Sequence, residues 1–218
     1  MAQKRQYQKE LDKILEELSG NNEIPKLLLH SCCAPCSSYV LEYLSKYFEI
    51  VDFFYNPNIA PEEEYRFRTE ELQRLIREMP LDNQVSFVEG KYDPEKFYTA
   101  VHGLEDEPEG GERCRVCFRL RLEEAAAEAK RQGCAYFTTT LTISPLKNAD
   151  LLNEIGEKTA AEAGLRFLPC DFKKRNGFQR STELSAKYDL YRQSYCGCIY
   201  SKKERLTIKS QAEIGTDR

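Results

Sequence analysis

The sequence predicts an α/β fold of three layers, in which a parallel β-sheet lies between two layers of helices. Five short apolar or β-branched runs alternate with longer stretches whose apolar residues recur at helical spacing. Strands that alternate with helices pair in parallel through right-handed crossovers. The 218 residues, 41% of them hydrophobic, suffice for one good-sized core, so we expect a single domain over residues 1–218.

The predicted strands share apolar or β-branched residues that are followed by turn signals. They cover residues 26–31, 49–55, 85–88, 135–142 and 166–171. The sheet core therefore extends over residues 21–170. After it the alternation stops, and we expect residues 171–218 to form an irregular C-terminal extension that carries a Cys-Gly-Cys motif, with one helix over residues 181–188 and a charged tail from Lys202.

The predicted helices follow from apolar spacing and from residues that start or stop helices. An N-terminal amphipathic helix ends at Gly20, and Pro61 with three glutamates starts a helix that runs to about Met79. Gly164 ends another. The remaining predicted helices cover residues 36–47, 97–101, 114–133 and 148–163. Arginines interleaved with glutamates on the helix after Pro61 predict a solvated face; they are Arg66, Arg68, Arg74 and Arg77.

Nine cysteines are the unusual feature of the composition. No segment approaches the roughly 20 apolar residues of a membrane span, and the charged N-terminus does not lead into an apolar signal core. We therefore expect a soluble, cytoplasmic protein with no membrane partner. A reducing compartment favours metal or redox use of cysteines over a disulfide framework. The net charge of −4 argues against nucleic-acid binding by bulk charge and leaves room for a local basic face.

Three cysteines, Cys32, Cys33 and Cys36, lie in the turn between the first predicted strand and its helix. Ligands of parallel α/β folds bind beyond the carboxyl ends of the strands, where this turn lies. Packing alone predicts isolated cysteines on apolar faces. Helix N-termini also lower the pKa of thiols, and metals bind the thiolate. The cluster therefore predicts a metal or redox site.

A second pair, Cys114 and Cys117, opens a predicted helix and places two thiols on one face. Thiolate-rich sites select zinc or iron–sulfur clusters. Zinc knuckles usually use two C-x-x-C motifs, which the adjacent Cys32 and Cys33 match poorly. Neighbouring thiols can each bind a different iron of a four-iron, four-sulfide cluster, so the spacing favours such a cluster on these four cysteines over zinc.

The remaining cysteines have several interpretations. Cys196 and Cys198, separated by one glycine, would form a tight, strained disulfide, and strained disulfides are easily reduced. This favours a redox-active pair; two incidental thiols or one more metal ligand are the alternatives. Cys134 is predicted to be a core residue. Cys170 is predicted either to line the pocket or to pack in the core.

Polar and basic segments near the predicted strand ends are further candidates. Tyr55, Asn56, Asn58 and residues 138–140 are predicted either to line the pocket or to be ordinary strand and turn residues. A later segment mixes positive charge with aromatic rings, as single-stranded RNA sites do. It contains Phe172, Lys173, Lys174, Arg175, Phe178 and Arg180.

Four motifs together resemble the epoxyqueuosine reductases of the QueH type. They are HSCCAPC at residues 30–36, ERCRVC at 112–117, TTLTISP at 139–145 and YCGC at 195–198. The similarity extends from about Lys26 to Arg205, and the combination is specific although each motif alone is not. The resemblance implies a Rossmann-like fold of the nucleotide α-hydrolase type. Residues 31–37 lack the glycines of the phosphate loop of that fold, so we expect ATP binding to be lost.

The resemblance also implies a reaction, its cofactors and its partners. The reaction is reduction of the epoxide of epoxyqueuosine, at the wobble position of tRNA, to queuosine, the last step of queuosine biosynthesis. A four-iron, four-sulfide cluster on Cys32, Cys33, Cys114 and Cys117 is implied. So are a redox-active pair, Cys196 and Cys198, and an additional metal ion, iron or zinc, for which Cys36 is the candidate ligand. The expected partners are the tRNA anticodon loop that bears epoxyqueuosine and an electron donor such as a ferredoxin or flavodoxin.

Removing the epoxide oxygen needs two electrons and two protons. His30, Asp171 and Tyr195 are the candidate proton donors. Three other functions compete with this one: a zinc-stabilised RNA-binding module without catalysis, a tRNA-thiolating or ATP-using enzyme of the same fold class, and a thioredoxin-like exchanger. The adjacent Cys32 and Cys33 argue against the zinc module, and the missing glycines argue against the ATP-using enzyme. The presence of three cysteine motifs argues against the thioredoxin-like exchanger.

Overall fold

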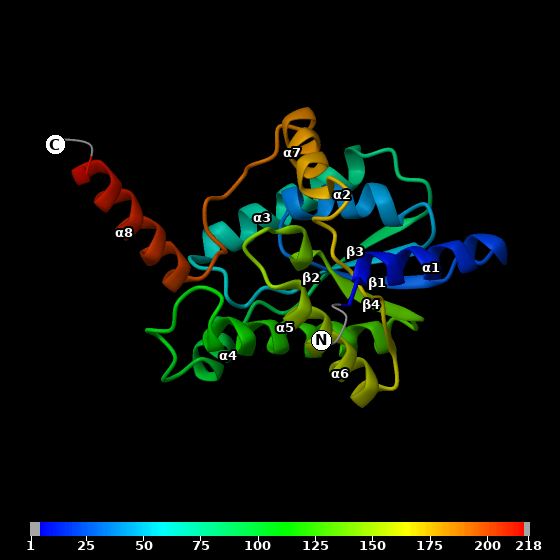
Figure 1. Cartoon of the computed structure of the whole chain (residues 1–218), viewed down its shortest axis with the longest axis horizontal. Coiled ribbons are helices and arrows are strands. Elements are labelled where there is room, and N and C mark those ends of the chain that lie inside the picture. The colour runs from blue at the N-terminus through cyan, green and yellow to red at the C-terminus, as the bar shows by residue number, and fades with distance from the viewer. Residues whose placement is uncertain (1–4, 216–218) are drawn as a thin grey trace.

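The structure, a computed structural model, describes residues 5–215, with side chains described up to residue 207. Its centre is a five-stranded sheet with helices on both faces (Figure 1). The strands are β1 (Lys26–Ser31), β2 (Glu49–Phe54), β3 (Val85–Glu89), β4 (Tyr136–Thr139) and β5 (Arg166–Phe167). They run in the order β3-β2-β1-β4-β5, and every pairing is parallel. The predicted three-layer, Rossmann-like α/β fold is confirmed.

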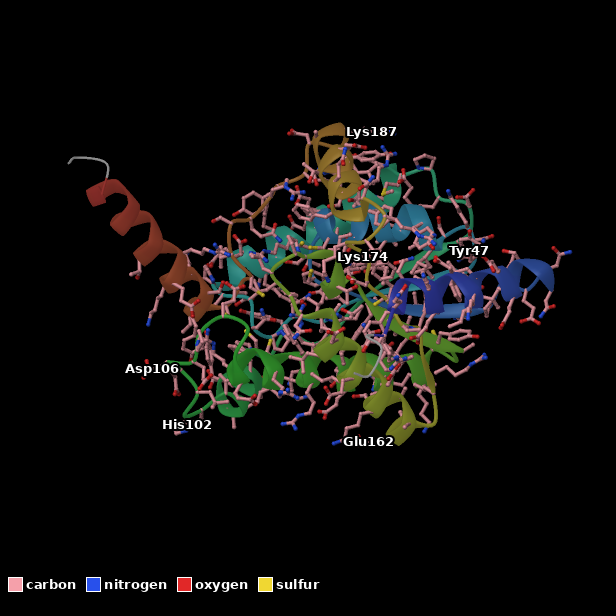
Figure 2. The ribbon with its side chains drawn as sticks, viewed as in Figure 1. Tyr47, His102, Asp106, Glu162, Lys174 and Lys187 are labelled. Atoms are coloured by element: carbon pink, nitrogen blue, oxygen red, sulfur yellow. The ribbon has the colours of Figure 1, made fainter. Side chains whose placement is uncertain are left out.

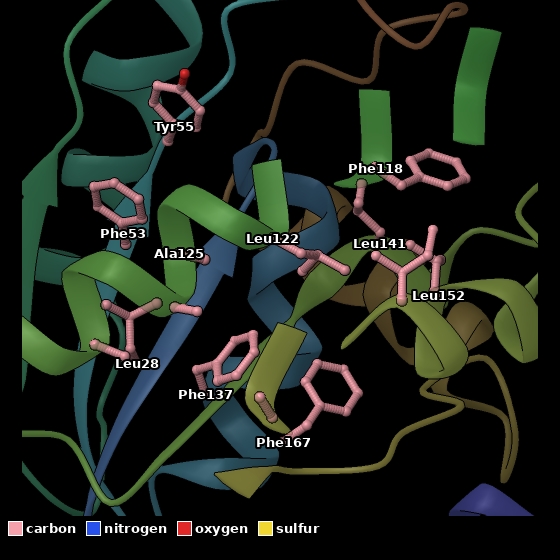
Figure 3. Packing of buried hydrophobic residues seen from close by; sticks show 14 of the residues in the cluster. Leu28, Phe53, Tyr55, Phe118, Leu122, Ala125, Phe137, Leu141, Leu152 and Phe167 are labelled. Atoms are coloured by element: carbon pink, nitrogen blue, oxygen red, sulfur yellow. The ribbon is translucent and has the colours of Figure 1, made fainter. Parts of the chain in front are cut away.

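The alternation of side chains along β1 explains the two helical layers. Leu27 and Leu29 pack on one face with α1 (Tyr7–Gly20) and α2 (Ala34–Leu44), and α3 (Glu62–Glu78) covers β2 and β3 on that face. Leu28 points to the other face, towards α5 (Glu112–Arg131) and α6 (Ala149–Ala163). Figure 3 shows this second core, in which Leu28 and Phe137 pack with Leu122 and Phe167. Both faces are covered, which is why the central strands are mainly apolar.

Two strands are shorter than the sequence predicts. β4 ends at Thr139 because the chain continues as a 3₁₀ helix, η1 (Thr140–Ile143). The Thr139 hydroxyl caps this helix by accepting a hydrogen bond from the Leu141 amide. β5 ends at Phe167. Pro169 has no N–H for the ladder, and the Cys170 amide donates to the Asn153 side chain instead.

The C-terminal extension is helical as well as irregular. α7 (Gly177–Lys187) begins before the predicted helix and packs on α2, and α8 (Ile199–Gly215) was not expected from the charged tail. In Figure 1, α8 extends away from the sheet and only its first turns meet the rest of the molecule. A short helix, α4 (Pro94–Ala100), lies beside the start of α5. Among the described residues, no helix is long and apolar enough to cross a membrane.

Candidate metal centre

The first cysteine group lies where β1 ends and α2 begins. The Sγ atoms of Cys32, Cys33 and Cys36 all lie within 4.8 Å of one another, and no other described group of at least three metal-binding residues is this close. Pro35 sits in the first turn of α2, where its missing N–H leaves no helical hydrogen bond unmade. The three thiols line a cavity of about 220 Å³ at the carboxyl edge of the sheet.

The three thiols are not equivalent. Hydrogen bonds from Cys33 and Cys36, helped by the charges of Arg121 and Lys147, hold the pKa of the Cys32 thiol well below its usual value. The hydrogen bond to Cys32 raises the pKa of Cys33 to about 12. The Thr140 hydroxyl lies 3.6 Å from the Cys32 sulfur and donates to it. The group therefore presents one thiolate with two thiol neighbours, a suitable starting state for metal binding.

The second pair opens α5. Cys114 is half-buried and accepts a hydrogen bond from the Gly110 amide, whereas Cys117 is buried and packs against Cys198. Burial raises the pKa of both thiols, that of Cys117 to about 12. Neither thiol is among the residues that line the cysteine cavity.

The third pair lies between the first two groups. Cys196 lines the cavity with Cys32, Cys33 and Cys36, whereas Cys198 packs with Cys117. Both thiols are free in the structure. The structure thus brings the three cysteine motifs to one end of the sheet, with the C-x-C segment as the link. The ligand set predicted from the sequence, Cys32, Cys33, Cys114 and Cys117, stays a prediction.

The C-x-C segment is held on both sides. Arg68 donates to the Cys196 carbonyl at 3.3 Å, and the Ala60 amide donates to the Gly197 carbonyl. Gly197 has a φ of 122°, and a side chain there would meet Ile59, so this position requires glycine. On the other side, Ser201 donates to the Glu109 carboxylate.

Three cations surround the cysteines. Burial alone would lower the pKa of Arg121, but the nearby residues Cys117, Cys196 and Cys32 raise it. The same balance applies to Lys147, whose pKa is raised by Cys196, Cys32 and Cys36. It also applies to Arg68, whose pKa is raised by Cys33 and by its ion-pair partner Glu64. These side chains would offset the negative charge that the cysteines carry when they bind a metal.

The surroundings of Arg121 show whether an iron–sulfur cluster would fit among these residues. Its side chain is 1% exposed, and one of its amino groups donates to Asn56 at 2.5 Å. The other, Nη1, is buried with no hydrogen-bond partner among the described atoms. Natural proteins seldom leave such a donor unmatched. Because cysteines of all three motifs lie near this guanidinium and raise its pKa, the orphaned donor fits an anionic sulfur-rich group bound beside it.

The structure separates the three candidate proton donors. His30 is fully buried and does not line the cavity. Its Nδ1 lies 2.9 Å from the Thr139 hydroxyl, and its Nε2 lies 3.1 Å from the Tyr55 carbonyl and 3.4 Å from Arg121 Nε. Burial and the nearby Arg121 lower the pKa of His30 to about 3, so the ring is neutral. Asp171 lines a different cavity and pairs with Lys173 at 2.5 Å. Tyr195 alone lines the cysteine cavity.

Three other residues singled out in the sequence lie outside the cysteine cavity. Asn56 is buried, donates to the Ser31 carbonyl and accepts from Arg121, so it positions that guanidinium. Cys134 packs in the core as predicted. Of the two interpretations of Cys170, the structure supports packing, because its sulfur is buried under the hydroxyls of Thr138 and Thr142.

Arg68 corrects the prediction of a solvated arginine face. Its side chain is 2% exposed, and it follows the buried stripe of α3 with Tyr65, Leu72 and Leu75. Arg121 is the other residue that the sequence analysis missed. It follows Cys117 by four residues and precedes Ala125 by four, so helical spacing alone places it on the buried face of α5.

The comparisons with known proteins identify a family. The family model described as epoxyqueuosine reductase QueH matches residues 27–204. Epoxyqueuosine reductase QueH of Streptococcus pyogenes is 43% identical over 92% of this chain and 80% of its own length. The protein of the same name from Thermotoga maritima is 37% identical over 88% of this chain and 97% of its own length.

Among solved structures, the chain matches NMN synthetase from Francisella tularensis. It has a TM-score of 0.44 and 13% identity over 89% of this chain and 77% of that chain. The family match covers the cysteine motifs at 32–36, 114–117 and 196–198. With the family model and full-length relatives in agreement, the chain belongs to the epoxyqueuosine reductase QueH family.

Proposed function

We propose that this protein reduces the epoxide of epoxyqueuosine in the anticodon loop of tRNA to the alkene of queuosine, the last step of queuosine biosynthesis. Two electrons and two protons enter, both carbon–oxygen bonds of the epoxide break, and the oxygen leaves as water. The observation that carries the proposal is the gathering of three cysteine motifs at one end of the sheet in a chain of this family. Cys32, Cys33, Cys36 and Cys196 line one cavity, and Cys198 links it to Cys117.

The cysteines would hold a redox centre. Cys32, Cys33, Cys114 and Cys117 are the proposed ligands of a four-iron, four-sulfide cluster, which when bound would supply electrons one at a time. Cys36 lies within 4.8 Å of the first two thiols and is the proposed ligand of an additional iron or zinc ion. Arg121 and Lys147 would offset the negative charge of such a centre.

The chain's own side chains would position the substrate and supply a proton. Tyr195 lines the cysteine cavity, and Arg68 and Lys202 lie 5.3 Å and 5.7 Å from the centre of its ring. Its hydroxyl is therefore the proton donor that we propose among the three candidates. His30 and Asp171 lie outside this cavity, so any role of theirs in proton transfer would have to pass through other groups.

The C-x-C pair would store electrons. We propose that Cys196 and Cys198 cycle between two thiols and a disulfide, releasing two electrons and two protons on oxidation. Cys196 faces the cavity and Cys198 faces Cys117, which places the pair between the proposed ligand groups. A ferredoxin or flavodoxin would return the electrons.

The first experiment tests the reaction and the cofactor together. The protein, purified without oxygen, is analysed for iron and acid-labile sulfide, then incubated with epoxyqueuosine-containing tRNA and a low-potential reductant. We expect at least four irons and four sulfides per chain and conversion of the modified nucleoside to queuosine. Zinc without iron, together with an unchanged nucleoside, would instead support an RNA-binding module.

A second experiment tests the redox pair. Changing Cys196 and Cys198 to serine should leave iron and sulfide content unchanged and impair multiple turnover. The matched control is Cys134→Ser, a core cysteine outside the site. Unchanged turnover of the double variant with both chemical and protein reductants would rule out the electron-storing role.

A further inference from the structure

A second cavity adjoins the cysteine cavity at the carboxyl edge of the sheet. Its volume is about 820 Å³, and it lies between the start of α1, the start of α6 and the segment that follows β5. Lys147 lines both cavities, so the two are neighbours. Six basic side chains line the second one, which we name the basic hollow: Arg5, Lys9, Lys147, Lys173, Lys174 and Arg175.

Three of these six residues form ion pairs with carboxylates of the same chain. Arg5 pairs with Glu10 and Glu157, Lys173 with Asp171, and Arg175 with Asp12. Lys147 lies beside the cysteines, whose charge it would offset. Within the described part of the chain, the other two basic residues, Lys9 and Lys174, have no carboxylate within ion-pair distance. Asp150 and Asp171 are the acidic residues of the lining. The hollow therefore keeps uncompensated positive charge in a chain whose net charge is −4.

Lys174 is placed so that its charge can reach a ligand in the basic hollow. Its backbone amide donates to the Asp171 carbonyl, in the tight turn that leads into α7. The side chain is exposed, and Figure 2 labels it in this segment. Lys9 is exposed on the first turns of α1. Two lysines far apart in the sequence thus face one hollow and offer point charges of the kind that bind phosphates.

The mouth of the cysteine cavity offers apolar contact surface beside this charge. Leu146, 62% exposed, and Phe178, 39% exposed, line the cysteine cavity from the α6 and α7 sides. Arg192 lies over the Phe178 ring, 5.7 Å from its centre. Exposed rings next to a positive groove are the combination that binds single strands through base stacking and phosphate contacts. Phe172, predicted as a second stacking ring, is instead 1% exposed and packs in the core.

We propose that a single RNA strand crosses this edge, with its backbone phosphates in the basic hollow and one base at the mouth of the cysteine cavity between Leu146 and Phe178. The continuity through Lys147 gives the strand a path from one cavity to the other. The identification of this RNA as tRNA rests on the proposed function. The proposed path adds which face of the protein holds the strand and which lysines contact it.

The test compares two double variants in the cluster-loaded full chain. One is Lys9→Ala with Lys174→Ala, in the hollow. The matched control is Lys46→Ala with Lys130→Ala, at the opposite edge of the sheet. Lys46 lies just beyond the C-terminal end of α2, and Lys130 lies in the last turn of α5. Binding of epoxyqueuosine-containing tRNA is measured by fluorescence anisotropy over a range of salt concentrations. Iron content and the single-turnover rate at saturating tRNA are measured in parallel.

We expect roughly tenfold weaker tRNA binding by the hollow variant. The slope of log affinity against log salt concentration should become shallower by about 1.4, which is about 0.7 for each of the two lost contacts on a single strand. Iron content and the saturated single-turnover rate should match the wild type, and the control should bind normally. Binding and salt slope unchanged in the hollow variant would overturn the proposal. So would normal tRNA binding with impaired reduction by a flavodoxin, since the hollow would then serve a protein partner. Failure of the wild type to reduce the epoxide would refute the proposed function and leave this binding result intact.

Discussion

A buried carboxyl group below the cysteine turn predicts an unusual dependence of stability on pH. Asp52 on β2 is fully buried, accepts a hydrogen bond from Ser31 at 2.8 Å, and has a second carboxyl oxygen without a partner. Desolvation raises its pKa from 3.8 to about 8 despite that hydrogen bond. The folded chain therefore keeps this proton up to about pH 8, whereas the unfolded chain loses it near pH 4.

The sign and size follow from proton linkage. Between these pH values the folded state binds one more proton than the unfolded state, so the stability contribution is fully present below about pH 4 and falls as pH rises. Each pH unit lowers the free energy of unfolding by about 1.4 kcal/mol, or by about 4 kcal/mol from pH 5 to pH 8. Asp52→Asn is nearly isosteric and cannot ionise, so the variant should gain this amount relative to the wild type.

The assay is anaerobic urea unfolding of wild type and Asp52→Asn at pH 5, 6, 7 and 8. Both proteins keep every cysteine, so metal binding and the other titrating groups largely cancel in the difference between them. Asp82→Asn, a change at an exposed loop residue, is the control and should give a flat difference. A difference for Asp52→Asn that stays constant within about 1 kcal/mol across this range would refute the claim that the buried group is protonated.

Three further predictions concern the metal centre. Cys33→Ser should lose iron and sulfide, whereas Cys134→Ser should retain both, as measured by metal and sulfide analysis. Arg121→Met should lower the reduction potential of the centre by on the order of 50–100 mV in an electron paramagnetic resonance titration, because it removes a buried positive charge, and Arg121→Lys should preserve most of that potential. Arg68→Ala leaves Glu64 without its partner and releases the Cys196 carbonyl. It should destabilise the protein by about 3 kcal/mol in thermal unfolding and slow turnover, and a lower iron content would contradict a role limited to the C-x-C segment.

The fold could be predicted because its signals are local. Each strand is a short apolar run, and Pro61 and Gly164 mark helix ends through their own backbone preferences. Where structure depends on distant contacts, the local pattern was insufficient. α8 has a charged sequence, and its first turns are fixed by Arg113, which contacts the Tyr200 ring and the Glu204 carboxylate.

The candidate site also has parts that local sequence patterns predict and parts that they do not. Thiol spacing identified the groups at 32–36 and 114–117, but no local pattern could show that the C-x-C segment lies between them. That position depends on Arg68, whose bond to the Cys196 carbonyl joins residues 128 positions apart in the sequence. Arg68 was misjudged because its glutamate neighbours dominate the composition of α3, although its spacing from Leu72 and Leu75 places it on the buried face.

Arg121 connects the folding of this chain to the group that it would bind. A buried guanidinium with an unmatched N–H is costly, and Asn56 satisfies only part of it. Cys117 and Cys32, one from each proposed ligand group, both raise the pKa of this arginine and therefore lie near its charge. An anionic cluster bound to those cysteines would therefore stabilise the arginine as well as being stabilised by it. Loading and folding should then be coupled in the arginine-containing chain, and less so in Arg121→Met, where neither the charge nor the donor is present.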